Sequence, residues 1–347
     1  MENQFGPIAL LSSGETSITG GRVFDAVAQR LPMPLRIAVL ETPAGFELNS
    51  PQVAGRVADF MRIRLQNYNP IIDIIPARKR GTPFSPDSAE ILGSLAQANL
   101  IFMGPGSPTY AVRQLRGSLA WDVLRLRHQQ GAALIFASAA TVAVGMCAIP
   151  VYEIYKVGED VRVVPGLDLF ADFGLTISFV PHWNNTDGGE DVDTSRCFIG
   201  LERFQQWCAQ LPSGHTTVGL DEHTGLLLDF AAEKCMVNGV SSVTLLRECN
   251  PEIFPAGAEF PLTELGNFHW PEKTEVQPGA KELLAHTPAA GGPEQVPEEV
   301  VGLVEERRQA RNRKDWARAD EYRLKIAALG WTVRDGTDGQ EIVRGGE

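Results

Sequence analysis

The feature that most constrains the fold is an alternation of short apolar runs with helical patterns in the first part of the chain. The runs are Ile8–Ser12, Arg36–Leu40, Ile71–Ile75, Leu100–Met103 and Ala133–Phe136. Helical patterns such as 51–66 and 88–97 lie between them. Short apolar runs are typical of strands covered on both faces, and strand–helix repetition implies right-handed crossovers in a parallel sheet. The sequence therefore predicts an α/β fold with ligands at the carboxyl ends of the strands.

The next part of the chain, residues 152–246, contains more strand signals than helix signals. The candidate strands are Leu175–Val180, Val218–Asp221, Leu226–Asp229 and Val240–Leu246. One helix, Thr194–Ala209, interrupts them. We interpret this part as the second half of the same α/β domain, with some antiparallel pieces at one edge of the sheet.

The last part of the chain predicts a separate small module. We expect the α/β domain to cover residues 1–271, and the Pro-, Gly- and Ala-rich stretch 272–296 to be a flexible linker. Residues 297–347 then predict a helical hairpin followed by a β-ribbon around Asp338-Gly339. In this hairpin we expect Trp316 to pack between the helices.

Composition and charge exclude several classes of protein. The chain has 347 residues and a net charge of −12, which is unlike a dedicated nucleic-acid binder unless a local patch makes the contact. No apolar run approaches the roughly 20 residues that span a bilayer, and the N-terminus lacks the basic segment of a signal peptide. The five cysteines (147, 197, 208, 235 and 249) show no metal-binding spacing. We expect a cytoplasmic protein with reduced thiols, no metal, no cofactor and no membrane partner.

Ser138 is the first candidate catalytic residue. It follows the fifth predicted strand directly and is followed by a helix of small residues, 139–145. A serine at a sharp strand-to-helix turn is exposed at the sheet edge, where the next N–H can stabilise an oxyanion. The alternative is that Ser138 only caps the helix.

Histidine and carboxylate candidates follow two other strands. His182 comes after the strand that ends at Val180, on the edge where Ser138 is expected. Asp221 and Glu222 end the strand that begins at Val218, and only one of these adjacent carboxylates can reach His182. The alternatives are that His182 is only a packed loop histidine and that the two acids are only solvated at a turn. His223 is left open as a further candidate base.

Two other motifs give weaker signals. The turn 104–107 (Gly-Pro-Gly-Ser) opens a helix and allows backbone to approach an anion, but it is neither a Rossmann nor a Walker motif. The acidic stretch 186–194 lacks the spacing of a calcium loop, and we expect a solvated loop there.

The order of these parts resembles the serine-peptidase family of dipeptidase E and cyanophycinase, within the class I glutamine-amidotransferase-like fold. The resemblance covers about residues 5–247 and depends on LIFMGPGSPTY, GAALIFASAATVAVG and VGLDEHTGLLLD. It implies a three-layer α/β fold with a mostly parallel sheet, and a serine hydrolase that cleaves a small peptide or amide substrate. Small peptides with acidic residues are the first substrates that the resemblance suggests.

The resemblance also assigns roles to individual residues. It implies that Ser138 is the nucleophile, His182 the base and Glu222 the third member of the triad. Amides of Ala139 and of the turn at Gly106 would form the oxyanion hole.

The sequence departs from the family pattern at several positions. Phe136 and Ala140 replace the two glycines that flank the family's serine, and Thr141 replaces a following alanine. Pro105 replaces a glycine in the turn, and proline has no N–H to donate. The alternative is therefore a degenerate member of the family that binds a ligand without hydrolysing it.

The tail resembles the small C-terminal module of cysteinyl-tRNA synthetases. The string VEERRQARNRKDWARADEYRLKIAALGWTVRDGTDG bears this resemblance, while the nucleotide motifs and zinc cysteines of the synthetase body are absent. Residues 307–325 contain eight basic and three acidic residues, a local charge of 8 − 3 = +5. The candidate RNA contacts are Arg307, Arg308, Arg311, Arg313 and Lys314. We expect the tail to contact tRNA without catalysing aminoacylation. The alternative is that these basic residues form only a solvated helix face. Whether the chain forms a homodimer is left open.

Overall fold

The computed structural model describes residues 5–248, 250–271, 274–286, 297–313, 315–336 and 339–344. The chain forms two compact units, residues 1–290 and 291–347. Among the cysteines, Cys147, Cys197 and Cys235 are buried free thiols, whereas Cys249 lies outside the described residues.

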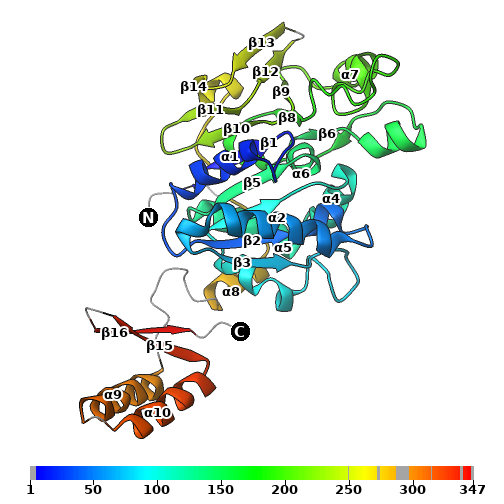
Figure 1. Ribbon diagram of the computed structural model, residues 1–347. Helices are drawn as coiled ribbons and strands as arrows, with labels where there is room; N and C mark the ends of the chain where they lie inside the picture. The colour runs from blue at the N-terminus through cyan, green and yellow to red at the C-terminus, as the bar shows by residue number, and fades with distance from the viewer. Residues whose placement is uncertain are drawn as a thin grey trace. The chain divides into compact units, whose positions relative to one another are not determined.

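An eight-stranded sheet forms the centre of the first unit, in the order β14-β11-β10-β1-β5-β4-β2-β3 (Figure 1). The five strands from β1 to β3 in this order are parallel, and β10, β11 and β14 join antiparallel beyond β1. The bounds are β1 Ile8–Leu11, β2 Arg36–Leu40, β3 Ile71–Ile75, β4 Leu100–Met103, β5 Ala133–Ala137, β10 Thr224–Asp229, β11 Lys234–Gly239 and β14 Glu259–Pro261. The predicted mostly parallel α/β fold is confirmed.

Helices cover both faces of this sheet (Figure 1). Successive residues of β1 show the period of two, because Ile8 and Leu10 lie in one apolar cluster and Ala9 and Leu11 in the other. The helices are α1 Ile18–Ala28 and α2 Ser50–Arg64 on one face, and α3 Gly93–Gln97, α4 Pro108–Leu115, α5 Leu119–Gln129, α6 Ala139–Ala143 and α8 Pro278–His286 on the other. The result is the expected three-layer architecture.

A second sheet packs beside the first, in the order β13-β12-β9-β8. Its strands are β8 Ile177–Val180, β9 Thr216–Leu220, β12 Ser242–Arg247 and β13 Asn250–Pro255, and α7 Gly200–Cys208 lies between β8 and β9 in the chain. The sequence predicted β8, β9 and β12, but not β13, as parts of one sheet with some antiparallel pieces at its edge. They separate because the chain turns sharply after β9, at 221–223, and β10 then pairs with β1.

Short elements complete the first unit. A two-stranded pair joins β6 Cys147–Ala148 to β7 Val164–Pro165, and a π-helical segment covers Glu153–Val157. The 3-10 segments are Thr42–Ala44, Gln66–Tyr68, Ala89–Ile91, Leu169–Phe173 and Leu262–Leu265.

Helix α8 corrects the predicted linker 272–296. Gln277 donates two hydrogen bonds, from its backbone and side-chain nitrogens, to Asp122 Oδ2, both at 3.0 Å. Ala280 is fully buried, and Leu283 and Leu284 pack against the same core. Small residues weaken the apolar pattern of a helix, but they allow it to pack closely against a core. The composition of this stretch therefore indicated a linker where the chain forms a helix. Residues 272–273 and 287–296 of the predicted linker lie outside the described residues.

The second unit consists of a helical hairpin and a ribbon. Its elements are α9 Glu298–Asn312, α10 Trp316–Ala328, and the antiparallel pair β15 Trp331–Gly336 and β16 Gly339–Arg344. Its apolar cluster contains Val300, Val304, Ile326, Trp331 and Val333. The prediction that Trp316 packs between the helices is wrong: the residue is 58% exposed. It occupies the first turn of α10, just after the capping residue Asp315, where its ring lies under the Arg311 guanidinium.

Candidate active site

Ser138 occupies a strained turn between β5 and α6. Its backbone has φ 52° and ψ −112°, a conformation that non-glycine residues rarely adopt. The serine N–H donates to the Leu11 carbonyl oxygen at 3.1 Å, and the Thr141 hydroxyl donates to the same oxygen at 2.8 Å. The Ser138 side chain makes no capping hydrogen bond to α6, so the capping alternative fails. Such a strained serine is typical of a nucleophile at a strand-to-helix turn.

His182 lies directly beside this serine. Its Nε2 is 2.9 Å from Ser138 Oγ, and its Nδ1 is 2.9 Å from Glu222 Oε1. The backbone at His182 is also left-handed, with φ 53°, and its N–H donates to the buried Ser12 hydroxyl at 2.7 Å. The loop after β8 therefore fixes the ring between a hydroxyl and a carboxylate.

Glu222 receives hydrogen bonds from three side chains. Besides His182, Asn185 Nδ2 donates to Oε1 at 2.8 Å, and the Ser13 hydroxyl donates to Oε2. Burial raises the pKa of Glu222, but these three hydrogen bonds outweigh it and lower the pKa of the carboxyl to about 2. The group is therefore an anion at neutral pH, oriented toward the imidazole.

The neighbours of Glu222 in the chain face elsewhere. Asp221 is buried, and its Oδ2 accepts from the Ser241 hydroxyl at 2.7 Å and the Ser242 N–H at 3.1 Å. The ring of His223 lies against Gly14, where a Cβ would come within 2.4 Å of Nδ1. Of the alternatives left open by the sequence, the structure thus brings His182 and Glu222, rather than His223 and Asp221, together with Ser138.

A small pocket of about 60 Å³ opens at Ser138 and His182, and both candidate oxyanion residues line it. Ala139 is the first residue of α6, so its N–H has no partner within the helix. Gly106 has φ 145°, and a Cβ there would lie 2.0 Å from the Pro43 carbonyl oxygen, so only glycine fits. The thiol of Cys197 also lines the pocket, but burial raises its pKa to about 12 and keeps it protonated.

The residues that depart from the family pattern lie outside this pocket. Phe136 is fully buried in the core, in register with Leu10 and Met103 on the adjacent strands. Pro105 lines a different cavity, between β2, α2 and β4. Neither side chain lines the triad pocket, so neither occupies the space of a substrate there.

The two units resemble different known proteins. The tail, residues 294–342, matches the family described as the cysteinyl-tRNA ligase anticodon binding domain. It is 44% identical over 59 residues to the cysteine–tRNA ligase of Methanosarcina acetivorans and 49% identical over 59 residues to that of Methanosarcina mazei. These matches cover 17% of this chain and 12% of each ligase. The tail is thus similar to one small domain of those enzymes.

The rest of the chain is similar in fold to a solved peptidase. A peptidase from an acI-B1 actinobacterium matches with a TM-score of 0.59 and 18% identity, over 75% of this chain and 98% of that chain. A putative peptidase E protein from Listeria monocytogenes EGD-e has a TM-score of 0.45 and 15% identity, over 68% and 100% of the two chains. At such identity the first match shows the fold alone. The resemblance inferred from the sequence is confirmed at that level.

Sequence reasoning missed three side chains that hold the site together. Ser12 and Ser13 follow β1, the strand paired with β5, and reach His182 and Glu222. Asn185 follows His182 by three residues and reaches Glu222. The available signal was their position: each is a polar residue just after a strand that ends at the same edge of the fold as Ser138.

The candidate RNA-binding residues of the tail differ in accessibility. Arg307 is only 4% exposed, because it lies on the face of α9 that also carries Val300 and Val304, so it does not contribute to an exposed patch. Arg308 is exposed and forms an ion pair with Glu305, at 2.7 Å. Arg313 is exposed, Arg311 is partly buried, and Lys314 lies outside the described residues.

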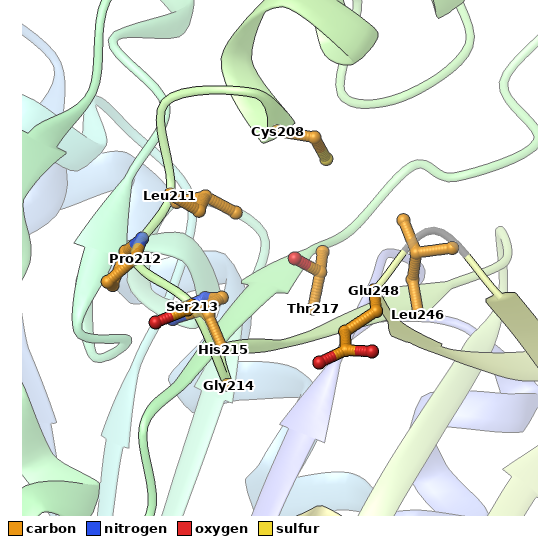
Figure 2. Close-up of a pocket in the computed structure, with 9 residues that line it drawn as sticks. All are labelled: Cys208, Leu211, Pro212, Ser213, Gly214, His215, Thr217, Leu246 and Glu248. Atoms are coloured by element: carbon orange, nitrogen blue, oxygen red, sulfur yellow. The ribbon is translucent and has the colours of Figure 1, made fainter.

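Another pocket, of about 190 Å³, shares no lining residue with the triad pocket. It is lined by the end of α7, the loop that follows it, β9 and the end of β12 (Figure 2). His215 borders it; burial lowers the pKa of this residue to about 4. No residue of the predicted site lines this pocket. Within the described ranges, no group of three or more His, Cys, Asp or Glu side chains could hold a metal ion, and no helix has the length and apolar character needed to cross a membrane.

Proposed function

We propose that the first unit is a serine hydrolase of the dipeptidase E and cyanophycinase type that cleaves a peptide or amide bond. The observation that carries this proposal is the continuous hydrogen-bonded series from Ser138 Oγ through both ring nitrogens of His182 to Glu222, each contact at 2.9 Å. The strained backbone of Ser138 and the pocket in front of it support the same function.

In the first half of the reaction, Ser138 Oγ forms a bond to the carbonyl carbon of the substrate. Its proton moves to Nε2 of His182, and the resulting imidazolium is stabilised by the Glu222 anion. The N–H groups of Ala139 and Gly106 are the candidate donors to the oxyanion. The C–N bond then breaks, and the proton on Nε2 goes to the departing amine.

The second half repeats these steps with water. His182 accepts a proton from water, the hydroxide adds to the ester carbon, and the bond to Ser138 Oγ breaks as the oxygen recovers its proton. Glu222 is ionised in the free protein, where its hydrogen bonds lower the pKa of the carboxyl to about 2, and in this anionic form it can stabilise the imidazolium.

The proposal is tested by a hydrolysis screen over short acidic peptides, isopeptides and glutamyl amides, with Ser138→Ala as the control. We expect at least one class to be cleaved by the wild type, with the rate reduced by about three orders of magnitude or more in the variant. Equal rates for the two proteins would remove Ser138 as the nucleophile.

Pro105 favours one alternative, a protein that binds a peptide-like ligand without hydrolysing it. This residue replaces a potential N–H donor in the turn before Gly106. If binding alone is the function, Ser138→Ala should leave ligand affinity and the biological effect of the protein unchanged, while no substrate is turned over. A loss of biological function with normal folding would instead support hydrolysis.

For the tail we propose contact with tRNA, on the basis of its similarity to an anticodon binding domain. Aminoacylation is not part of this proposal. Arg308, Arg311 and Arg313 are the candidate contacts to phosphates among the described residues. Gel-shift titration of the full chain with total tRNA at two salt concentrations tests it: binding should weaken with salt, and less steeply when these arginines are replaced by alanine. Absence of binding at low salt would contradict it.

For the location of the chain we propose the cytoplasm. The buried free thiols of Cys147, Cys197 and Cys235 support a reducing compartment.

A further inference from the structure

A second and larger cavity, of about 420 Å³, adjoins the triad pocket. The two spaces share Val151, Tyr152 and Phe198 as common walls. The Phe198 ring lies 5.1 Å from the His182 ring and 6.0 Å from the Tyr155 ring, measured between centroids. A substrate whose scissile carbonyl group lies at Ser138 therefore has this cavity beside it, and the cavity is of the size that small ligands occupy.

The surface of this cavity is mainly apolar and aromatic. Tyr155 and Val192 line it in addition to the shared walls. Its two charged side chains are both engaged with neighbours: the Lys156 ammonium is 4.5 Å from the Tyr155 ring centroid, and Asp187 accepts from Asn185 Nδ2 at 3.1 Å. The walls thus offer ring faces and methyl groups to an occupant, together with few unsatisfied polar groups.

The charges that line the cavity give an acidic occupant no net attraction. The segment 186–194, which supplies one wall, contains four carboxylates and no Lys or Arg. Of these four carboxylates only Asp187 belongs to the lining, and Lys156 is the basic residue of the lining, so the lining charge is 1 − 1 = 0. A substrate carboxylate placed here would lose part of its hydration against apolar walls, with no net positive charge in the lining to compensate that loss.

We propose that this cavity is the side-chain subsite of the hydrolase and selects a large apolar or aromatic residue beside the scissile bond, in preference to an acidic one. The inference rests on the proposed function and names its substrate class. Tyr155, Val192 and Phe198 determine the specificity. The acidic preference suggested by the family resemblance does not apply to this subsite.

The test is a panel of dipeptides carrying Phe, Leu, Ala, Lys or Asp at each position, assayed by amine release. We expect kcat/KM at one position to be at least about tenfold higher for Phe or Leu than for Asp. Val192→Asp should reduce that ratio about tenfold through KM, and Val301→Asp, an exposed valine of the tail, serves as the matched control. Labelling of Ser138 by a small fluorophosphonate, which needs no side-chain subsite, should be equal in all three proteins.

The outcomes separate this inference from the proposed function. If Ser138 is labelled but Asp dipeptides are cleaved best, the subsite inference is wrong and the hydrolase stands. A Phe preference that Val192→Asp leaves intact would also overturn it. If no Ser138-dependent labelling and no cleavage occur, the hydrolase itself fails and the subsite fails with it.

Discussion

Glu222 receives its three hydrogen bonds from two separate parts of the chain: Ser13 in the segment after β1, and His182 and Asn185 in the loop after β8. Asp221, one residue earlier, instead accepts hydrogen bonds from the Ser241 hydroxyl and the Ser242 N–H. Two adjacent carboxylates thus have different roles because the corner after β9 sends their side chains in different directions. This pair provides a matched comparison for testing the triad.

We predict that Glu222→Gln lowers kcat by about 10³- to 10⁴-fold. The amide can donate to Nδ1, which would leave the proton on Nε2 and prevent that nitrogen from accepting the Ser138 proton. Asp221→Asn should change kcat only a few-fold, since its carboxylate does not touch His182. Steady-state kinetics on both variants, with folding checked by circular dichroism, make the comparison. Equal losses in the two variants would show that Glu222 has no special role.

A second prediction at this scale concerns His128, which lies near the amino end of β1 among the rings of Phe5, Phe173 and Phe230. Its Nε2 is 2.8 Å from the Gly6 carbonyl oxygen, and burial lowers its pKa from 6.5 to about 4. The unfolded chain therefore binds more protons at this residue between pH 6.5 and pH 4. Stability is full above pH 6.5 and falls as the pH drops toward 4, by on the order of 3 kcal/mol.

The measurement is the free energy of unfolding in urea at several pH values for the wild type and His128→Gln. The variant should lose part of the slope between pH 6.5 and 4. His215, with its pKa also lowered to about 4, should account for a remaining slope. An identical pH dependence in the two proteins would contradict the account of His128.

At the scale of elements, apolar runs predicted β1, β2, β4 and β5 well because parallel strands buried on both faces have uninterrupted apolar sequences. The run of β3 was also predicted, although this edge strand is largely exposed. The apolar pattern failed for β11, β13 and β14, whose strands alternate or lie at sheet edges with exposed residues. It also failed for α8, since Pro, Gly and Ala suggested a linker. The separate second sheet could not be predicted, because the sharp corner at 221–223 depends on long-range pairing of β10 with β1.

We predict that α8 contributes to the stability of the first unit. Ala280 is fully buried against the core, so Ala280→Glu should place a charge there and destabilise the fold by about 3 kcal/mol or more. The adjacent Lys281 is exposed, and Lys281→Glu should change stability by at most about 0.5 kcal/mol. Urea unfolding of the two variants gives the answer. Equal, small effects would favour the flexible linker that the composition indicated.

At the scale of the whole molecule, two resemblances coexist in one chain. The triad residues were predictable because each polar group follows a strand, and carboxyl ends of neighbouring strands meet at one edge. Their support by Ser12, Ser13 and Asn185 was not predictable, since serine and asparagine are common in loops for many other reasons. The accessibility of the tail arginines also required the structure: Arg307 lies on the buried face of α9, and charge alone does not reveal this.

The central claim is that Ser138 is an activated nucleophile, and intact-mass measurement of fluorophosphonate labelling tests it most directly. The wild type should gain the mass of one phosphonyl group, with the adduct at Ser138. Ser138→Ala should gain none, and Glu222→Gln should react much more slowly. Labelling of wild type and Ser138→Ala to the same extent, or no labelling of either folded protein, would contradict the claim.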